Sequence, residues 1–152
     1  MFNILLICTG NTCRSPMAQA LLADIWQKGP RKKQLNLISA GVFTFDDMPA
    51  SAEAIQVMQE SNIDISGHRS KQVTEELLAS ADLILTMTES HRQRILEMFP
   101  EYAAVIHTIT AYIGHDDEVA DPFGRGLAAY YDTLEQLEAI MDQLVDKLED
   151  EM

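Results

Sequence analysis

A cysteine and an arginine share one short polar segment near the start of the chain, residues 8–15, with the sequence CTGNTCRS. Five residues separate Cys8 from Arg14, and Gly10 allows a tight backbone turn between them. The backbone N–H groups of such a turn can point at one centre, which makes an anion site. Arg14 can add two parallel hydrogen bonds to a bound phosphoryl group. The segment is therefore typical of a phosphate-binding loop.

The same surroundings would activate Cys8 as a nucleophile. A thiol beside a helix N-terminus and a guanidinium is more readily present as the thiolate. A thiolate inside an oxyanion-binding loop is arranged for covalent phosphoryl transfer. On the loop alone, a structural role for Cys8 as a small buried residue that ends a strand stays open.

Hydrophobic periodicity places this segment between a strand and a helix. Residues 2–7 are apolar except for Asn3, as expected for a buried parallel strand. Pro16 then opens a helix, at the position that proline prefers. Ligands of parallel sheets bind outside the carboxyl ends of the strands, so we expect the functional site at this loop.

Strands and helices alternate along the rest of the chain. We expect further strands over residues 35–39, 83–87 and 105–109. We expect further helices over residues 51–58 and 89–98, a short one that begins near residue 74, and a long amphipathic one from residue 127. The pattern predicts an α/β fold with a single domain over residues 1–152: a parallel four-stranded sheet with helices on both faces and a phosphate-binding loop after the first strand.

Composition and charge exclude several classes of function. The 152 residues are 47% hydrophobic and 23% charged, as in an ordinary globular domain. Lys and Arg number 11 against 24 Asp and Glu, a net charge of −13, so we expect no nucleic-acid partner and no anionic membrane surface. Residues 132–151 hold eight of the acids and one Lys, and they are interpreted as a solvated helix face.

The cysteine count and the apolar runs indicate a location. Two cysteines make no disulfide framework, which favours a reducing compartment. No apolar run reaches 18 residues, and the first eight residues lack the features of a signal peptide. We therefore expect a cytoplasmic protein without a membrane segment.

Residues 8–17 resemble the active-site loop of the low-molecular-weight protein tyrosine phosphatase family. The resemblance extends along almost the whole chain. Residues 39–41 resemble the second-strand motif of the family, His68 falls where the family has a loop-supporting histidine, and residues 121–122 resemble its general-acid loop. The order of the predicted elements also agrees with the family.

The resemblance implies a role for each matching residue. Cys8 would be the nucleophile, and Arg14 would bind the phosphoryl group and stabilise the transition state. Asp121 would protonate the leaving group and then activate the water that hydrolyses the phosphocysteine. The residues expected to surround the substrate are Thr9, Gly10, Asn11, Thr12, Cys13, Ser15 and Phe123. No metal or other cofactor is expected, because backbone amides and Arg14 supply the electrostatic stabilisation.

Four of the matching residues would support the loop. Ser15 would hydrogen-bond to the thiolate, and Asn11 would hold the strained loop, since Asn tolerates positive φ. Ser39 and His68 would support the loop from outside. From the residues alone, Ser39 can simply end a strand, and His68 can be a surface loop residue.

Two positions depart from the tyrosine-specific members of the family. Thr12 stands where many have a larger aliphatic residue, and Phe123 is a single aromatic where two tyrosines often follow Asp-Pro. This combination resembles the bacterial protein-arginine phosphatase branch. Thr12 is stiff at χ1, so its hydroxyl can meet a phosphoguanidinium or orient the attacking water, and its methyl can narrow the slot against a phenol ring. Phe123 can stack on a planar guanidinium, and the acids at residues 116–118 can help hold it.

The resemblance thus implies hydrolysis of phosphoarginine in proteins through a phosphocysteine intermediate. The alternative is a low-molecular-weight tyrosine phosphatase acting on phosphotyrosine. A thioredoxin-linked arsenate reductase needs further cysteines, which residues 80–95 do not contain. A non-catalytic anion-binding module would not need Cys8 and Asp121. A monomer that acts on phosphorylated proteins is expected.

Cys13 lies in the same loop as Cys8. Related enzymes form a reversible disulfide between such a pair under peroxide, and a thiolate with a nearby second thiol is the usual setting for it. The resemblance therefore implies that the pair is redox-sensitive. A role for Cys13 as a packed small residue stays open.

Overall fold

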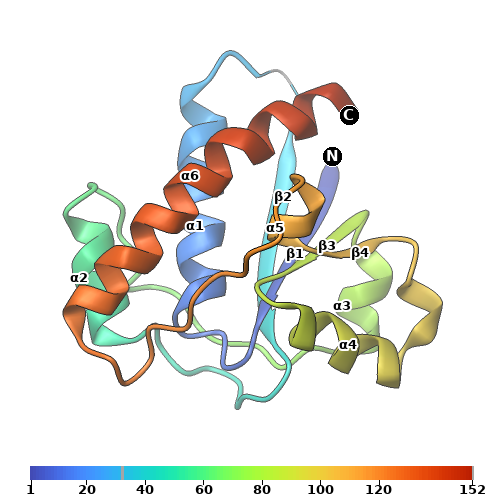
Figure 1. Ribbon diagram of the computed structural model, residues 1–152, viewed down its shortest axis with the longest axis horizontal. Coiled ribbons are helices and arrows are strands. Elements are labelled where there is room, and N and C mark those ends of the chain that lie inside the picture. The colour runs from blue at the N-terminus through green and yellow to red at the C-terminus, as the bar shows by residue number, and fades with distance from the viewer. Residues whose placement is uncertain (32, 152) are drawn as a thin grey trace.

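A computed structural model describes residues 1–31 and 33–151, and its centre is a four-stranded parallel sheet (Figure 1). The strands are β1 (Phe2–Cys8), β2 (Leu35–Gly41), β3 (Leu83–Thr86) and β4 (Ile106–Thr108). Their order is β2-β1-β3-β4, so β1 is paired on both sides. The predicted fold class is confirmed.

Helices cover both faces of the sheet because the side chains of β1 alternate between two cores. Ile4 and Leu6 belong to the larger core, whereas Leu5 and Ile7 belong to the smaller one. The helices of the larger core are α1 (Arg14–Lys28), α2 (Ala52–Gln59), α5 (Ile109–Tyr112) and α6 (Leu127–Glu151). Those of the smaller core are α3 (Glu75–Ser80) and α4 (Glu89–Met98). Figure 1 shows α6 lying across α1, and residues of the two helices are in contact.

The first helix begins earlier than the sequence predicted. α1 starts at Arg14, and Pro16 is its third residue. The first four N–H groups of a helix have no partner within the helix, so proline is tolerated there. The N–H of Met17 already donates to the carbonyl of Cys13 at 3.1 Å. Arg14 therefore belongs to the helix and lies directly at its N-terminus.

The predicted fourth strand was too long. β4 ends at Thr108, and the buried residue Ile109 begins the short helix α5 instead. A short apolar run does not distinguish a strand from a buried helical turn. A 3₁₀ turn at Pro100–Tyr102 was also not predicted.

The long C-terminal helix has the predicted apolar stripe. Leu134, Leu137, Met141, Leu144 and Leu148 are all buried against the larger core. None of the helices described in residues 1–31 and 33–151 is long and apolar enough to cross a membrane.

Candidate active site

Cys8 ends the central strand, and its thiol is surrounded by hydrogen-bond donors. Its Sγ lies 2.9 Å from Ser15 Oγ, and the backbone N–H of Asn11 donates to it at 3.3 Å. Ser15 Oγ accepts a hydrogen bond from Asn11 Nδ2 at 2.8 Å, which leaves the hydroxyl hydrogen free to donate to the sulfur. Two donors are therefore directed at Sγ.

Asn11 holds the loop from the inside. It is fully buried with φ of 57°, in the left-handed region that Asn tolerates. Its Nδ2 also donates to Ser39 Oγ at 2.9 Å, and its Oδ1 accepts the N–H of Lys71 at 2.9 Å. His68 Nε2 donates to its carbonyl oxygen at 2.7 Å. The structure thus brings Asn11, Ser15, Ser39 and His68 together.

Partial burial lowers the pKa of His68, and the positive charges of Lys71 and Arg69 lower it further. The hydrogen bond to the carbonyl of Asn11 acts in the opposite direction. His68 therefore serves the loop as a neutral Nε2–H donor at neutral pH.

Backbone groups just after β2 hold the loop by hydrogen bonds. Val42 N–H donates to the carbonyl of Cys8, and Phe43 N–H donates to that of Thr9, both at 3.0 Å. A Cβ at Gly41 would lie 2.6 Å from the carbonyl oxygen of Thr9, closer than such atoms approach. Gly41 is thus needed for the close approach of the loop, whereas the sequence placed it only in a segment that resembles the second-strand motif of the family.

Arg14 and Asp121 meet across the cavity above Cys8. The guanidinium of Arg14 is buried, and its Nη1 donates to the carbonyl of Val119 at 3.1 Å. Its Nη2 lies 3.6 Å from Asp121 Oδ2. Asp121 Oδ1 accepts the N–H of Phe123 at 3.1 Å, and the carboxylate is more than half exposed. The guanidinium is therefore oriented by the loop that carries the carboxyl group.

One cavity of about 710 Å³ contains these groups. Cys8, Arg14 and Asp121 line it, and Thr12 and Phe123 line it as well. A second hollow, of about 700 Å³ between α1 and β2, touches the loop only through its partner His68 and contains no thiol. The chemistry expected of Cys8 therefore belongs to the first cavity.

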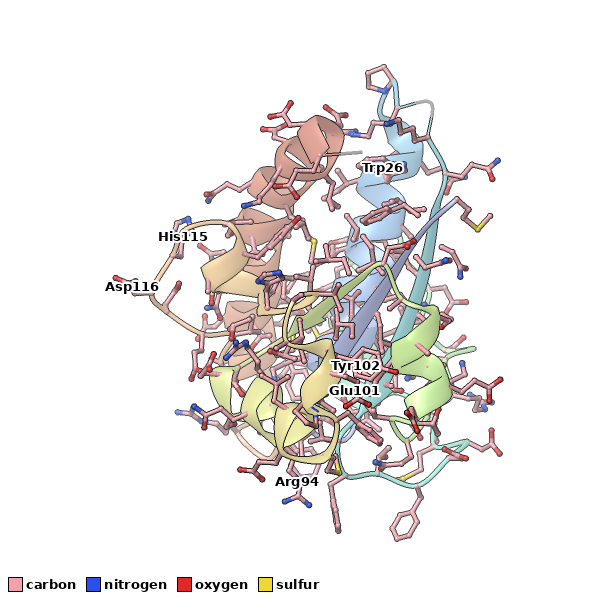
Figure 2. All side chains as sticks on the ribbon, turned by 90° about the vertical axis from the view of Figure 1, so that its right-hand side faces the viewer. Trp26, Arg94, Glu101, Tyr102, His115 and Asp116 are labelled. Carbon is pink, nitrogen blue, oxygen red and sulfur yellow. The ribbon has the colours of Figure 1, made fainter. Side chains whose placement is uncertain are left out.

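The acids at residues 116–118 do not lie beside the substrate site, where the sequence predicted them. None of them lines the cavity of Cys8. The carboxylate of Glu118 instead accepts the N–H of Glu89 at 2.6 Å, at the N-terminus of α4, where a helix attracts negative charge. Figure 2 shows Asp116 on a different side of the molecule from Arg94, which does line the cavity. The expectation that these acids hold a guanidinium was wrong.

His91 contacts the loop, and the sequence reasoning missed it. It is buried in the first turn of α4, where its Nδ1 accepts the N–H of Thr88 at 3.2 Å. In the neutral ring, Nε2 then carries the hydrogen and donates to Thr9 Oγ1 at 2.8 Å. Burial, and then the charge of Arg14, lower the pKa of His91 to about 4. The available signal was its position just after a buried strand, at the same sheet edge as Cys8.

Cys13 packs into the larger core beside a tyrosine. Its Sγ lies 3.1 Å from Tyr130 Oη on α6 and 3.6 Å from Ser51 Oγ. Burial raises the pKa of Tyr130, so its hydroxyl stays protonated and can donate to this sulfur. Both Cys8 and Cys13 are free thiols. The side chain of Thr12 is half-buried beside them at the mouth of the cavity.

Comparisons with known proteins find similarity along nearly the whole chain. The family described as low molecular weight phosphotyrosine protein phosphatase matches residues 3–152. The protein-arginine-phosphatase of Bacillus subtilis (strain 168) is 40% identical over 147 residues, which are 96% of each chain.

Two solved structures are similar over nearly their whole length. The YwlE arginine phosphatase from Geobacillus stearothermophilus has a TM-score of 0.91 at 39% identity, covering 99% of this chain and 95% of that one. A low molecular weight protein tyrosine phosphatase from T. tengcongensis has a TM-score of 0.91 at 42% identity, covering 97% and 99%. This chain therefore belongs to the low molecular weight phosphotyrosine protein phosphatase family.

Proposed function

We propose that this chain is a cysteine-dependent protein phosphatase that hydrolyses phosphoarginine in proteins. The observation that carries the proposal is the cavity in which Cys8 Sγ, the Arg14 guanidinium and the Asp121 carboxyl group meet. The similarity to a protein-arginine-phosphatase at 40% identity supports this choice of substrate. The phosphatase domain spans residues 1–152, and no cofactor takes part.

In the first step, the thiolate of Cys8 attacks phosphorus. An S–P bond forms while the P–N bond of phosphoarginine breaks. Asp121 gives its proton to the departing guanidine nitrogen, so that the leaving group departs neutral or protonated rather than as an anion. Backbone N–H groups of the loop and the fork of Arg14 bind the phosphoryl oxygens, where negative charge develops.

In the second step, water hydrolyses the phosphocysteine. The carboxylate of Asp121 takes a proton from the water, the new O–P bond forms, and the S–P bond breaks. Cys8 leaves as a thiolate, which Ser15 and the N–H of Asn11 stabilise. Inorganic phosphate is released, and the enzyme returns to its first state.

Thr12 is proposed as the residue that favours phosphoarginine. It lines the cavity mouth, and its branched side chain has few χ1 rotamers, so its hydroxyl and methyl keep fixed directions. Phe123 lines the same mouth and offers an exposed ring face to a planar guanidinium.

The test compares a phosphoarginine peptide with a phosphotyrosine peptide of otherwise identical sequence. We expect a higher kcat/KM for phosphoarginine in the wild type, and a shift of about tenfold or more toward phosphotyrosine in Thr12→Ile. Cys8→Ser is the blank for hydrolysis without the nucleophile. If Thr12→Ile leaves the ratio unchanged, Thr12 does not select the substrate.

Phosphotyrosine hydrolysis is the second candidate function. It is favoured by the tyrosine phosphatase structure at 42% identity and by Phe123, whose ring can also stack on a phenol. A wild-type preference for the phosphotyrosine peptide would select this function and leave the two chemical steps unchanged, with the P–O bond broken in place of P–N.

We further propose that Cys8 and Cys13 form a reversible disulfide. Peroxide would oxidise the Cys8 thiolate to a sulfenic acid, and the Cys13 thiol would then attack its sulfur, so that the S–S bond forms and water leaves. Peroxide should then inactivate the enzyme, and a thiol reductant should restore it. Full recovery of a Cys13→Ala variant after the same treatment would contradict this role of Cys13.

The enzyme is proposed to act as a cytoplasmic monomer on phosphorylated proteins. The cavity is open at its mouth, where apolar side chains are exposed, as access for a protein substrate requires. Light scattering across a range of concentrations tests the monomer, and a constant mass of about 17 kDa is expected.

A further inference from the structure

Exposed apolar side chains gather around the mouth of the catalytic cavity. Among residues 1–31 and 33–151, seven large apolar side chains are exposed, and five of them line this cavity. The five, here called the apolar rim, are Phe43, Phe45, Met48, Met98 and Phe123, and their exposed fractions run from 44% to 78%. The other two, Met1 and Tyr131, lie outside it. Exposed apolar patches of this kind mark interaction surfaces.

The rim is built by three separate segments of the chain. Residues 43–48 follow β2, Met98 ends α4, and Phe123 follows Asp121. The three segments converge only in the folded chain, at the carboxyl edge of the sheet. In Figure 2, Arg94 of α4 points outward at the lower edge of the molecule. Because Arg94 also lines the cavity, this is the side on which α4 borders the mouth.

Hydrogen bonds fix the segment at residues 43–48 in its exposed position. Thr44 N–H donates to Gln72 Oε1 at 2.9 Å. Ser70 Oγ accepts the N–H of Met48 at 2.9 Å and donates to the carbonyl of Phe45 at 2.6 Å. The backbone beneath Phe45 is thus held on both sides, and its ring is presented to solvent by a fixed loop. A preformed surface loses little conformational entropy when it binds.

The position of the rim limits what can cover it. It is continuous with the cavity of Cys8, so a substrate that places its phosphoryl group on the loop must run past the rim. A free phosphorylated amino acid ends inside the cavity and leaves most of the rim uncovered, whereas a polypeptide continues on both sides. Apolar side chains next to the phosphorylated residue would remove rim surface from water, which is favourable in proportion to the area buried.

We propose that the apolar rim binds apolar side chains that flank the phosphorylated residue of a protein substrate. The enzyme would then prefer phosphorylated residues within apolar stretches of sequence. The inference rests on the proposed phosphatase function and adds the sequence context of the substrate to it.

The experiment uses pairs of phosphopeptides that differ only in the residues on both sides of the phosphorylated one. One member has leucine at these flanking positions, and the other has serine. The ratio of the two kcat/KM values is measured for the wild type, for Phe45→Ser, for Met98→Ser, and for Tyr131→Ser as a matched control outside the cavity. Because each ratio compares two peptides on one variant, a change in the chemical step cancels.

We expect the wild type to favour the leucine peptide by about tenfold, which corresponds to about 1.4 kcal/mol. The ratio should fall below about threefold in Phe45→Ser and in Met98→Ser, and stay near its wild-type value in Tyr131→Ser. Equal rates for the two peptides in the wild type would overturn the proposal, and so would a preference that survives both rim variants.

The pairs are prepared with phosphoarginine and, separately, with phosphotyrosine. If only the phosphotyrosine pair is hydrolysed, the proposed choice of substrate fails, while the ratio for that pair still decides the role of the rim. If wild-type enzyme hydrolyses neither pair, the phosphatase function fails, and this inference fails with it.

Discussion

Two loops border the same cavity, and they are held in different ways. The phosphate loop, residues 8–15, is mostly buried and is hydrogen-bonded from several sides, with Asn11 and Ser15 fully out of contact with solvent. The acid loop, residues 120–124, is anchored through the backbone of Ala120, whereas the side chains of Asp121 and Phe123 are exposed. One loop is fixed before substrate arrives, and the other stays accessible to it.

The two loops differ in burial because they contact different parts of the substrate in the proposed mechanism. The phosphoryl group is the same in every substrate, and its charge is best stabilised by dipoles that do not reorganise during the reaction. In the proposed mechanism, the leaving group and the polypeptide differ between substrates, and the groups assigned to them lie at the exposed mouth. Substitutions in the phosphate loop should therefore alter both activity and stability, whereas those in the acid loop should alter activity alone.

The largest effect is expected from Arg14→Lys. An ammonium cannot reproduce the planar fork, and the hydrogen bond to Val119 that orients it would be lost. We expect kcat/KM to fall by about 10³-fold, in line with the loss of a group that binds the transition-state charge. Steady-state hydrolysis of a phosphopeptide measures it, with Arg125→Lys on the exposed surface as the control. A loss below tenfold would remove Arg14 from the phosphoryl site.

Asp121→Asn tests the exposed loop. The amide cannot donate a proton to the leaving group, so kcat should fall by roughly 10² to 10³-fold. The loss should be smaller for p-nitrophenyl phosphate, whose leaving group needs no proton. The free energy of unfolding should stay within about 0.5 kcal/mol of wild type, because the carboxylate is more than half exposed and lies 3.6 Å from Arg14 Nη2. Full activity on phosphopeptides would assign the acid to another residue.

Asn11→Ala tests the buried loop. Alanine disfavours the φ of 57°, and its methyl group leaves Ser39 Oγ and the N–H of Lys71 without their partner. We expect a loss of about 2–4 kcal/mol in the free energy of unfolding and a ten- to hundredfold loss in kcat/KM. Urea unfolding and steady-state assays measure the two effects.

Asn62→Ala is the matched control for this substitution. Asn62 has a similar φ of 60° but is exposed in a turn outside the site. Asn62→Ala should lower the free energy of unfolding by about 1 kcal/mol and leave kcat/KM unchanged. If Asn11→Ala proves as mild as Asn62→Ala, the buried hydrogen bonds do not hold the loop.

The smallest effect on activity is expected at His91. His91→Ala removes the donor to Thr9 Oγ1 and should lower kcat/KM by about three- to tenfold, whereas His91→Gln keeps an N–H donor and should recover part of it. Equal losses in the two variants would show that only the packing of the ring matters.

His91 also predicts a pH dependence of stability. Its pKa is about 4 in the folded protein against 6.5 for an ordinary histidine, so between these values the unfolded chain binds a proton that the folded chain does not. The free energy of unfolding should therefore decrease as pH falls from about 6.5 to about 4. Urea unfolding at pH 7 and pH 5 measures it. The decrease should be smaller in His91→Gln and unchanged in His115→Gln, an exposed control.

The sequence by itself determined the features that depend on neighbouring residues. The apolar run before Cys8, the helix after the loop and the stripe of the C-terminal helix are local patterns, and the structure has all three. The loop could be recognised because its groups lie within eight consecutive residues. The predicted start of α1 and the predicted end of β4 were wrong, because the end of an element depends on which backbone hydrogen bonds form in the folded chain.

Only the tertiary structure decided the contacts between distant segments. Thr9 meets His91 across 82 residues of chain, Arg14 meets Val119 across 105, and Cys13 meets Tyr130 across 117. These pairs exist because the order β2-β1-β3-β4 brings the carboxyl ends of the strands to one edge, and because α6 packs across α1. A sequence pattern shows which residues prefer burial or a turn. The hydrogen-bond partner of a buried polar group lies on another element, and only the packing of the two elements determines which partner it is.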